Sequence, residues 1–207
     1  MIKKTNYWLV LISVYLLSFY NISGQKKVFL SDFDELFSIW DTSQYKDENN
    51  ALQLRCPKID TVKIGLIGLG NRGQMALERL PNIQGVKIVA IADIDSNKVN
   101  SSYNKYFKSS SLPKPDRYYL KNDWKEICHR NDVDLIYVCT HWELHTPIAL
   151  YAMENNKHVA VEVPAALTVK DCWDLVKTAE RTKKHCIQLE NCMYDFFEIS
   201  VLNMVQN

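Results

Sequence analysis

Three glycines stand in the pattern Gly68-x-Gly70-x-x-Gly73, directly after a short apolar run and before a stretch with helical spacing. Between a strand and a helix, such glycines permit a tight turn, close approach of the backbone to a pyrophosphate, and close helix–strand packing. The N–H groups at the start of the helix then face the negative charge of the phosphates. The pattern therefore predicts a dinucleotide-binding loop, and a glycine-rich turn without a ligand is the alternative.

Asp93 ends the next apolar run, 20 residues after Gly73. A carboxylate at this position accepts hydrogen bonds from both hydroxyls of the adenosine ribose and repels a 2′-phosphate, so NAD is predicted in preference to NADP. Asp95 is a second candidate for this role, and a solvent-facing aspartate at a strand end is the alternative. Arg72, inside the loop, either neutralises phosphate charge or lies on the surface at the helix start.

Two further segments follow apolar runs, and ligands bind there because the carboxyl ends of parallel strands meet at one edge of the sheet. In residues 140–145, a tryptophan offers a flat apolar surface and His145 a polar tip near the cofactor. Glu162, which a Val-Pro pair follows, is expected near the nicotinamide half, with an ordinary charged loop residue as the alternative. The two histidines of the first segment lie in a loop and do not match a zinc-protease motif, so no metal site is predicted.

Strand-like apolar runs and helical spacing alternate five times along the chain. The expected strands cover residues 62–67, 86–92, 135–139, 158–163 and 185–190. The expected helices cover residues 71–80, 96–107, 123–130, 146–155 and 168–182, with a last one from about residue 193. Thr146 and Thr168 are the predicted caps of two of them. This alternation predicts the α/β class, with a doubly wound parallel sheet of Rossmann type and helices on both faces.

The first residues have the three parts of a secretory signal peptide. Lys3 and Lys4 give a basic start, residues 8–20 are almost wholly apolar, and small residues follow up to Gly24. The apolar run is short for a membrane span, and an uncleaved membrane anchor is the alternative. We therefore expect residues 1–24 to direct export to the periplasm or the exterior, with cleavage after Gly24 and no stable membrane span afterwards.

The remaining chain is expected to comprise a connector at 25–60 with a short helix at 30–40, a nucleotide-binding domain at 61–200, and the start of a further domain at 201–207. Hydrophobic residues make up 47% of the chain, which is enough for a core. The formal net charge of +1 and the lack of a basic stripe argue against a nucleic-acid partner. The six cysteines include no Cys-x-x-Cys pair, and most are expected in the core, with disulfide formation left open.

These segments together resemble the Gfo/Idh/MocA oxidoreductase family, whose members have an N-terminal Rossmann domain, a Glu-Lys-Pro motif and an α/β substrate domain. Here a valine stands at the position of the lysine, which assists proton transfer in that family. Residues 70–73, 158–166 and 189–195 look like glycoside hydrolase family 109, and the resemblance covers about residues 55–200. It implies NAD contacts at Asn71, Arg72, Asp93, Trp142, Glu143, Leu144, His145, Glu162, Val163 and Asn191. Leu144 departs from the aromatic residue that the resemblance leads us to expect.

The resemblance implies an NAD-dependent α-N-acetylgalactosaminidase, in which NAD⁺ oxidises the sugar at C3, the glycosidic oxygen is eliminated, water adds, and the hydride returns. It also implies a C-terminal domain, missing from this chain, that carries the sugar contacts and the acid/base residues, so no catalytic residue is assigned. The alternatives are a sugar oxidoreductase of the wider family and a non-catalytic nucleotide-binding remnant. We expect the isolated chain to bind NAD without full activity, and assembly into a homo-oligomer stays open.

Overall fold

The computed structural model describes residues 51, 54–191 and 195–206. The predicted signal peptide and the predicted helix at residues 30–40 lie outside this range. None of the helices within it combines the length and the apolar character that crossing a membrane requires.

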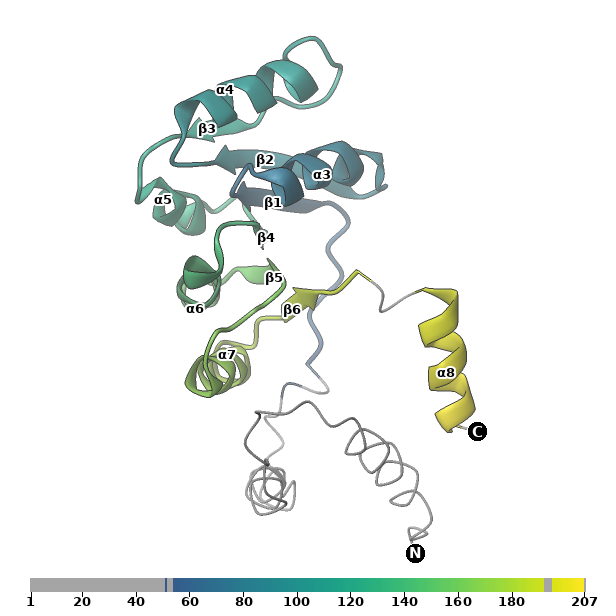
Figure 1. The fold of residues 1–207 in the computed structure, drawn as a ribbon. Helices are drawn as coiled ribbons and strands as arrows, with labels where there is room; N and C mark the ends of the chain where they lie inside the picture. The colour runs from purple at the N-terminus through teal and green to yellow at the C-terminus, as the bar shows by residue number, and fades with distance from the viewer. Residues whose placement is uncertain (1–50, 52–53, 192–194, 207) are drawn as a thin grey trace, which may run out of the picture. The chain divides into compact units, whose positions relative to one another are not determined.

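The described chain forms a parallel sheet of six strands in the order β3-β2-β1-β4-β5-β6 (Figure 1). The strands are β1 (Val62–Ile67), β2 (Val86–Ala92), β3 (Asp116–Tyr118), β4 (Leu135–Val138), β5 (His158–Glu162) and β6 (Cys186–Leu189). Five of them match predicted strands. Four of these are apolar runs of the kind that a sheet buries, whereas β6, at the edge of the sheet, has exposed side chains at Ile187 and Gln188. The strand order reverses between β1 and β4, which is where ligands bind in open α/β sheets.

The sequence does not predict β3, which pairs with β2 at the edge of the sheet. This strand has only three residues, and the first two, Asp116 and Arg117, are exposed. A short, charged edge strand lacks the apolar run from which a strand is predicted. Charged residues at an edge also protect a sheet from pairing with other chains.

The helices connect the strands as the alternating pattern predicts. They are α3 (Asn71–Arg79), η3 (Leu80–Asn82), α4 (Ser96–Tyr103), η4 (Asn104–Lys108), α5 (Asp123–His129), η5 (Trp142–Leu144), α6 (His145–Glu154), α7 (Val169–Thr182) and α8 (Phe196–Gln206). The hydroxyl of Thr168 accepts a hydrogen bond from the Asp171 N–H at 3.1 Å, which confirms the predicted cap of α7.

The predicted cap of α6 is wrong. This helix begins at His145 rather than after Thr146, and no side chain caps it. The Thr146 hydroxyl instead donates to the carbonyl oxygen of Ala165 at 3.0 Å, in the segment that follows β5. The Thr146 hydroxyl, which the sequence pattern predicts as a helix cap, therefore makes a hydrogen bond to a distant segment of the chain instead.

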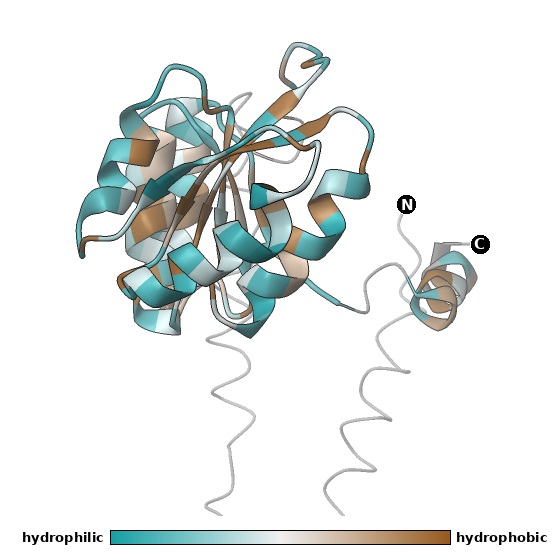
Figure 2. Ribbon diagram, turned by 90° about the horizontal axis from the view of Figure 1, so that it is seen from above, coloured by the Kyte–Doolittle hydropathy of each residue, from teal (hydrophilic) through white to brown (hydrophobic). Residues whose placement is uncertain are grey.

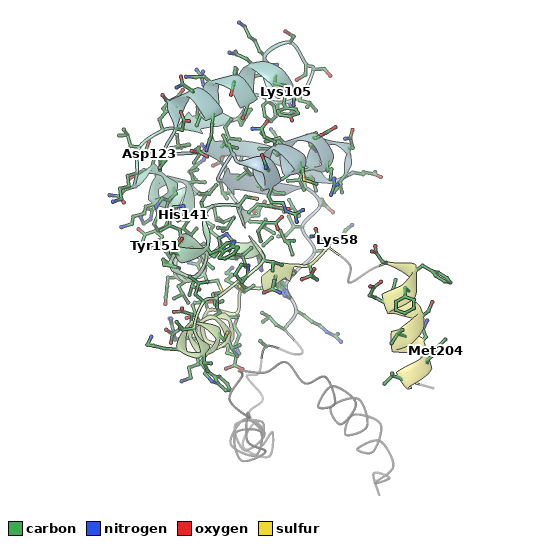
Figure 3. The ribbon with its side chains drawn as sticks, in the orientation of Figure 1. Lys58, Lys105, Asp123, His141, Tyr151 and Met204 are labelled. Carbon is green, nitrogen blue, oxygen red and sulfur yellow. The ribbon has the colours of Figure 1, made fainter. Side chains whose placement is uncertain are left out.

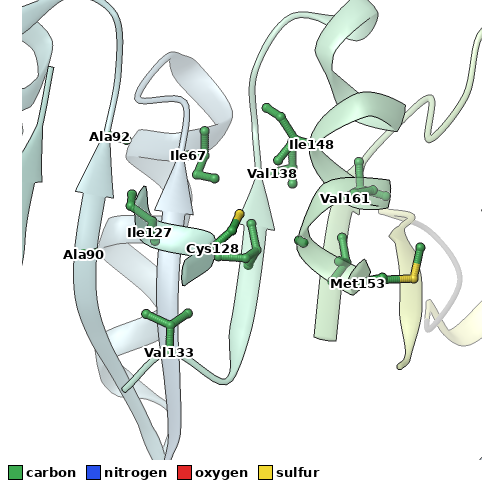
Figure 4. Close-up of a cluster of buried hydrophobic side chains, with 14 of the residues drawn as sticks. Ile67, Ala90, Ala92, Ile127, Cys128, Val133, Val138, Ile148, Met153 and Val161 are labelled. Atoms are coloured by element: carbon green, nitrogen blue, oxygen red, sulfur yellow. The ribbon is translucent and has the colours of Figure 1, made fainter. Parts of the chain in front are cut away.

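The sheet carries a separate hydrophobic cluster on each face. On one face, Ile127 and Ile148 pack from α5 and α6 onto the strands (Figure 4). Leu175 of α7 belongs to the same cluster. On the other face, Leu77 and Val99 pack from α3 and α4 onto side chains such as Leu66 and Ile91. Figure 2 shows the strands as the hydrophobic layer between helices whose outer faces are hydrophilic. The prediction of helices on both faces is therefore confirmed.

Candidate dinucleotide site

The loop between β1 and α3 contains the three glycines of the predicted phosphate loop. Gly68 has a φ of +96°, and a Cβ built on it would lie 2.5 Å from the carbonyl oxygen of Cys139. A Cβ on Gly73 would lie 2.0 Å from the carbonyl oxygen of Gly68, whereas a Cβ on Gly70 would meet no atom within 4 Å. Packing within the protein thus explains why positions 68 and 73 hold glycine. The open space at Gly70 instead suits a ligand that approaches the backbone.

A cavity of about 440 Å³ opens beside this loop. Its walls come from the segments that follow β1, β2 and β4, on both sides of the point where the strand order reverses. The predicted residues in these walls are Gly68, Gly70, Asn71, Arg72, Asp93 and Leu144. No side chain caps α3 at Gly70, which leaves the N–H groups of its first turn for an anion. The open glycine, the uncapped helix and the carboxylate together fit a dinucleotide.

Asp93 and Gln74 hold the phosphate loop at Leu69. The Oδ2 atom of Asp93 accepts a hydrogen bond from the Leu69 N–H at 2.8 Å. The Gln74 side chain donates to the Leu69 carbonyl at 3.2 Å and to the Ser102 hydroxyl at 2.6 Å. Asp93 therefore orients the loop as well as lining the cavity, and this second role follows from no sequence pattern.

Asp95, the second candidate for the ribose contact, has a different role. Its Oδ1 atom accepts a hydrogen bond from the Asn97 N–H at 2.9 Å, so Asp95 caps α4. Its own N–H donates to Oδ1 of Asp93 at 2.9 Å. Asp93 is thus the carboxylate of this pair that faces the cavity.

Leu120 and Trp124, together with the exposed Ile94, give the cavity apolar walls beyond Asp93. Asp123, labelled in Figure 3, accepts hydrogen bonds from the backbone N–H groups of Tyr119 and Leu120 at 3.0 and 2.9 Å. It thereby fixes the loop that carries Leu120. No sequence pattern predicts these walls, because they join elements that only the sheet topology brings together.

Arg72 lies where the cavity meets a second hollow of about 380 Å³ between α3 and the ends of β4, β5 and β6. Its guanidinium donates to Oδ1 of Asn191 at 3.3 Å and lies 3.9 Å from Oε2 of Glu162. Three residues predicted from separate motifs thus meet at the carboxyl end of the sheet. The phosphate contact of Arg72 remains a prediction.

In the segment after β4, some side chains line the cavity, some are exposed to solvent, and one is buried. His141, labelled in Figure 3, and Leu144 line the cavity. Trp142 is 60% exposed and Glu143 is also exposed. The His145 side chain is 1% exposed, with its ring nitrogens 2.8 Å from the Pro164 carbonyl and 3.0 Å from the Thr140 carbonyl. The structure therefore places His145 behind the loop rather than on the cavity wall.

The carboxyl end of β5 presents a carboxylate, Glu162, and an apolar residue, Val163, follows it. The Glu162 side chain is 13% exposed and faces the second hollow together with Tyr137. Val163, at the position of the family's lysine, is 40% exposed. Burial raises the pKa of the Tyr137 hydroxyl, and the negative charge of Glu162 adds to the shift. The Tyr137 hydroxyl therefore stays protonated near neutral pH.

The cysteines near the site are buried thiols. Burial raises the pKa of Cys139, which lines the cavity directly after β4, and raises that of Cys128, in α5, to about 12. Both remain protonated near neutral pH and are poor nucleophiles. Among the described residues, His, Cys, Asp and Glu side chains do not gather in groups of three that could hold a metal ion.

Residues 62–189 match the model of the Gfo/Idh/MocA family, described as an oxidoreductase family with an NAD-binding Rossmann fold. A glycosyl hydrolase family 109 protein from Porphyromonas gingivalis is 49% identical over 158 residues, which cover 76% of this chain and 34% of that protein. An alpha-N-acetylgalactosaminidase from Bacteroides fragilis is 47% identical over 160 residues, which cover 77% of this chain and 37% of that protein. The chain thus spans about a third of the length of the curated relatives it matches.

Two solved structures have the same fold at low sequence identity. A myo-inositol 2-dehydrogenase from Lactobacillus plantarum has a TM-score of 0.61 and 23% identity over 71% of this chain and 41% of its own. A dehydrogenase from Chromobacterium violaceum, solved in complex with NADH and UDP-GlcNAcA, has a TM-score of 0.61 and 20% identity over 74% of this chain and 43% of its own.

Proposed function

Because the chain belongs to the Gfo/Idh/MocA oxidoreductase family and carries its NAD-binding Rossmann domain, we propose that it serves an NAD-dependent glycosidase of the α-N-acetylgalactosaminidase type. The observation that carries this proposal is the identity of 49% to a glycosyl hydrolase family 109 protein and of 47% to an alpha-N-acetylgalactosaminidase, each over about three quarters of the chain. The valine at position 163 agrees with it, since the resemblance to the wider family leads us to expect a lysine in ordinary sugar oxidoreductases.

In this proposal, the residues of the chain bind and orient NAD. The Gly70 backbone and the first turn of α3 receive the pyrophosphate, and Asp93 accepts hydrogen bonds from the adenosine ribose. Arg72, Glu162 and Asn191 border the nicotinamide end. Bound NAD⁺ supplies a hydride acceptor that can return the hydride within one catalytic cycle. The sugar substrate, an α-linked N-acetylgalactosaminide, is contacted by parts that the longer relatives possess.

A chimera tests the proposal directly. The 160 residues of this chain that match the Bacteroides fragilis enzyme would replace their counterparts in that enzyme. We expect the chimera to release p-nitrophenol from the α-N-acetylgalactosaminide without net formation of NADH. A chimera that folds and binds NAD but releases no p-nitrophenol contradicts the proposal. Net NADH formation from free sugars instead supports a sugar oxidoreductase.

We also propose that residues 1–24 direct export. Expression of the complete chain, followed by fractionation and N-terminal sequencing, tests this. We expect an exported protein that begins near Gln25. A protein that retains Met1 and stays with the membrane supports the uncleaved anchor instead.

A further inference from the structure

Three side chains hold the segment that follows β5. The His145 ring contacts the Pro164 carbonyl at 2.8 Å, and the Thr146 hydroxyl donates to the Ala165 carbonyl at 3.0 Å. The Ala165 N–H donates to the side-chain carbonyl of Gln188, on β6, at 3.1 Å. The backbone at residues 164–165 is therefore fixed from α6 on one side and from β6 on the other.

The same His145 ring also holds the segment that follows β4. Its Nε2 atom lies 3.0 Å from the carbonyl oxygen of Thr140, while its Nδ1 atom faces Pro164. A neutral imidazole donates through one nitrogen, and the doubly protonated ring donates through both. Because a carbonyl oxygen only accepts, both contacts are hydrogen bonds when each ring nitrogen carries a proton. The buried ring thus lies between the ends of two neighbouring strands, and His145 is separated along the chain by 19 residues from Pro164 and by 5 from Thr140.

Both connected segments border the cofactor site. Thr140 lines the cavity together with His141 and Leu144. Pro164 follows Glu162 by two residues, and Glu162 faces Arg72 of the phosphate loop at 3.9 Å. A shift of either segment would therefore change the walls of the site, although the His145 side chain itself is only 1% exposed.

We infer that His145 is a positioning residue, which couples the loop after β4 to the segment after β5 through backbone carbonyls and so sets the shape of the NAD site. This inference rests on the proposed NAD binding. It assigns His145 no contact with the cofactor. The role comes from its two carbonyl partners, because a single hydrogen bond would hold only one of the segments.

Three substitutions at His145 separate the contribution of the contact with Pro164 from that of the contact with Thr140. In His145→Asn the amide nitrogen takes the place of Nδ1 and can still donate to Pro164. In His145→Gln it takes the place of Nε2 and can still donate to Thr140. In His145→Leu neither bond remains, whereas the buried volume is largely kept. Met153→Ala serves as the control, because Met153 is fully buried at the other end of the same helix, α6.

The experiment measures the Kd for NAD by calorimetry and the Tm without NAD, for the complete chain and each variant. We expect His145→Leu to weaken NAD binding by roughly tenfold or more, the Asn and Gln variants to fall between it and the wild type, and Met153→Ala to lower Tm with little change in Kd. If His145→Leu does not fold, the Asn and Gln variants decide, because each must weaken NAD binding relative to the wild type.

Wild-type affinity in the folded His145 variants overturns the inference alone, and so does an equal loss of affinity in Met153→Ala at the same drop in Tm. A wild-type chain that does not bind NAD overturns the proposed function, and the inference with it. The two failures are therefore distinguishable within one set of measurements.

Discussion

Substitution of Gly70 by alanine separates ligand binding from folding more cleanly than the same substitution at Gly68 or Gly73. Gly70 has a φ of −70°, which alanine adopts without strain, and the added Cβ would meet no protein atom within 4 Å. The free energy of unfolding should therefore change by no more than about 0.5–1 kcal/mol, and the loss of glycine flexibility in the unfolded chain makes a slight gain the expected direction.

NAD binding should suffer far more from Gly70→Ala. The methyl group would occupy the space through which the pyrophosphate approaches the backbone. Loss of one hydrogen bond to a charged phosphate costs about 1.5–3 kcal/mol. Since about 1.4 kcal/mol corresponds to a tenfold change in Kd, we expect NAD to bind roughly 10- to 150-fold more weakly.

Gly73→Ala is the matched control for Gly70→Ala. Its Cβ would lie 2.0 Å from the Gly68 carbonyl oxygen, so the loop or the helix must shift. Overpacking of this kind costs about 1–3 kcal/mol, and each kcal/mol lowers Tm by roughly 2–4 °C in a chain of this length. Calorimetry gives the Kd values, and thermal unfolding gives the stabilities. If Gly70→Ala binds NAD like the wild type, or loses as much stability as Gly73→Ala, the reasoning about the open position is refuted.

Three further predictions concern Asp93, α7 and pH. Asp93→Asn keeps one acceptor oxygen, which serves either the Leu69 N–H or the Asp95 N–H but not both, and it removes the charge. NAD should therefore bind more weakly, and the ratio of the Kd values for NADP and NAD should decrease. Calorimetry with both nucleotides measures this, and an unchanged ratio of the two Kd values contradicts it. Thr168→Ala removes the cap of α7 and should lower the free energy of unfolding, measured with urea, by about 1 kcal/mol without changing the Kd for NAD. An unaltered free energy of unfolding would argue against the cap. Burial, aided by the positive charges of Lys184 and His185, lowers the pKa of His158, whose Nδ1 accepts a hydrogen bond from the His185 N–H. The unfolded chain then binds more protons below about pH 6.5, so stability should fall as pH drops through this range. His158→Asn should reduce the slope, and an identical pH dependence in that variant contradicts the assignment.

The sequence predicts the parts of this fold that depend on local apolar pattern. Five strands and the helices between them are predicted from such patterns. The glycine motif also predicts the close backbone approach that the structure has at Gly68 and Gly73. The short edge strand β3 escapes detection because its first two residues are polar and exposed.

The roles of the site residues are harder to predict, because they depend on contacts between segments far apart in the chain. Thr146 has the type and position of a helix cap, yet its hydroxyl is used by Ala165. His145 has the character of a polar tip near a ligand, yet its ring is buried between two carbonyl groups. Gln74 carries no motif, although its side chain holds Leu69 of the phosphate loop.

The central claim, that NAD binds at the loop around Gly70, is tested most directly by NMR on the ¹⁵N-labelled chain. The chain has six glycines, and Gly85 lies before β2, at the opposite end of that strand from Asp93. On addition of NAD, we predict saturable shifts of the Gly68, Gly70 and Gly73 amide signals, with the Gly85 signal unchanged. Saturable NAD binding that leaves the Gly70 signal in place would contradict this account.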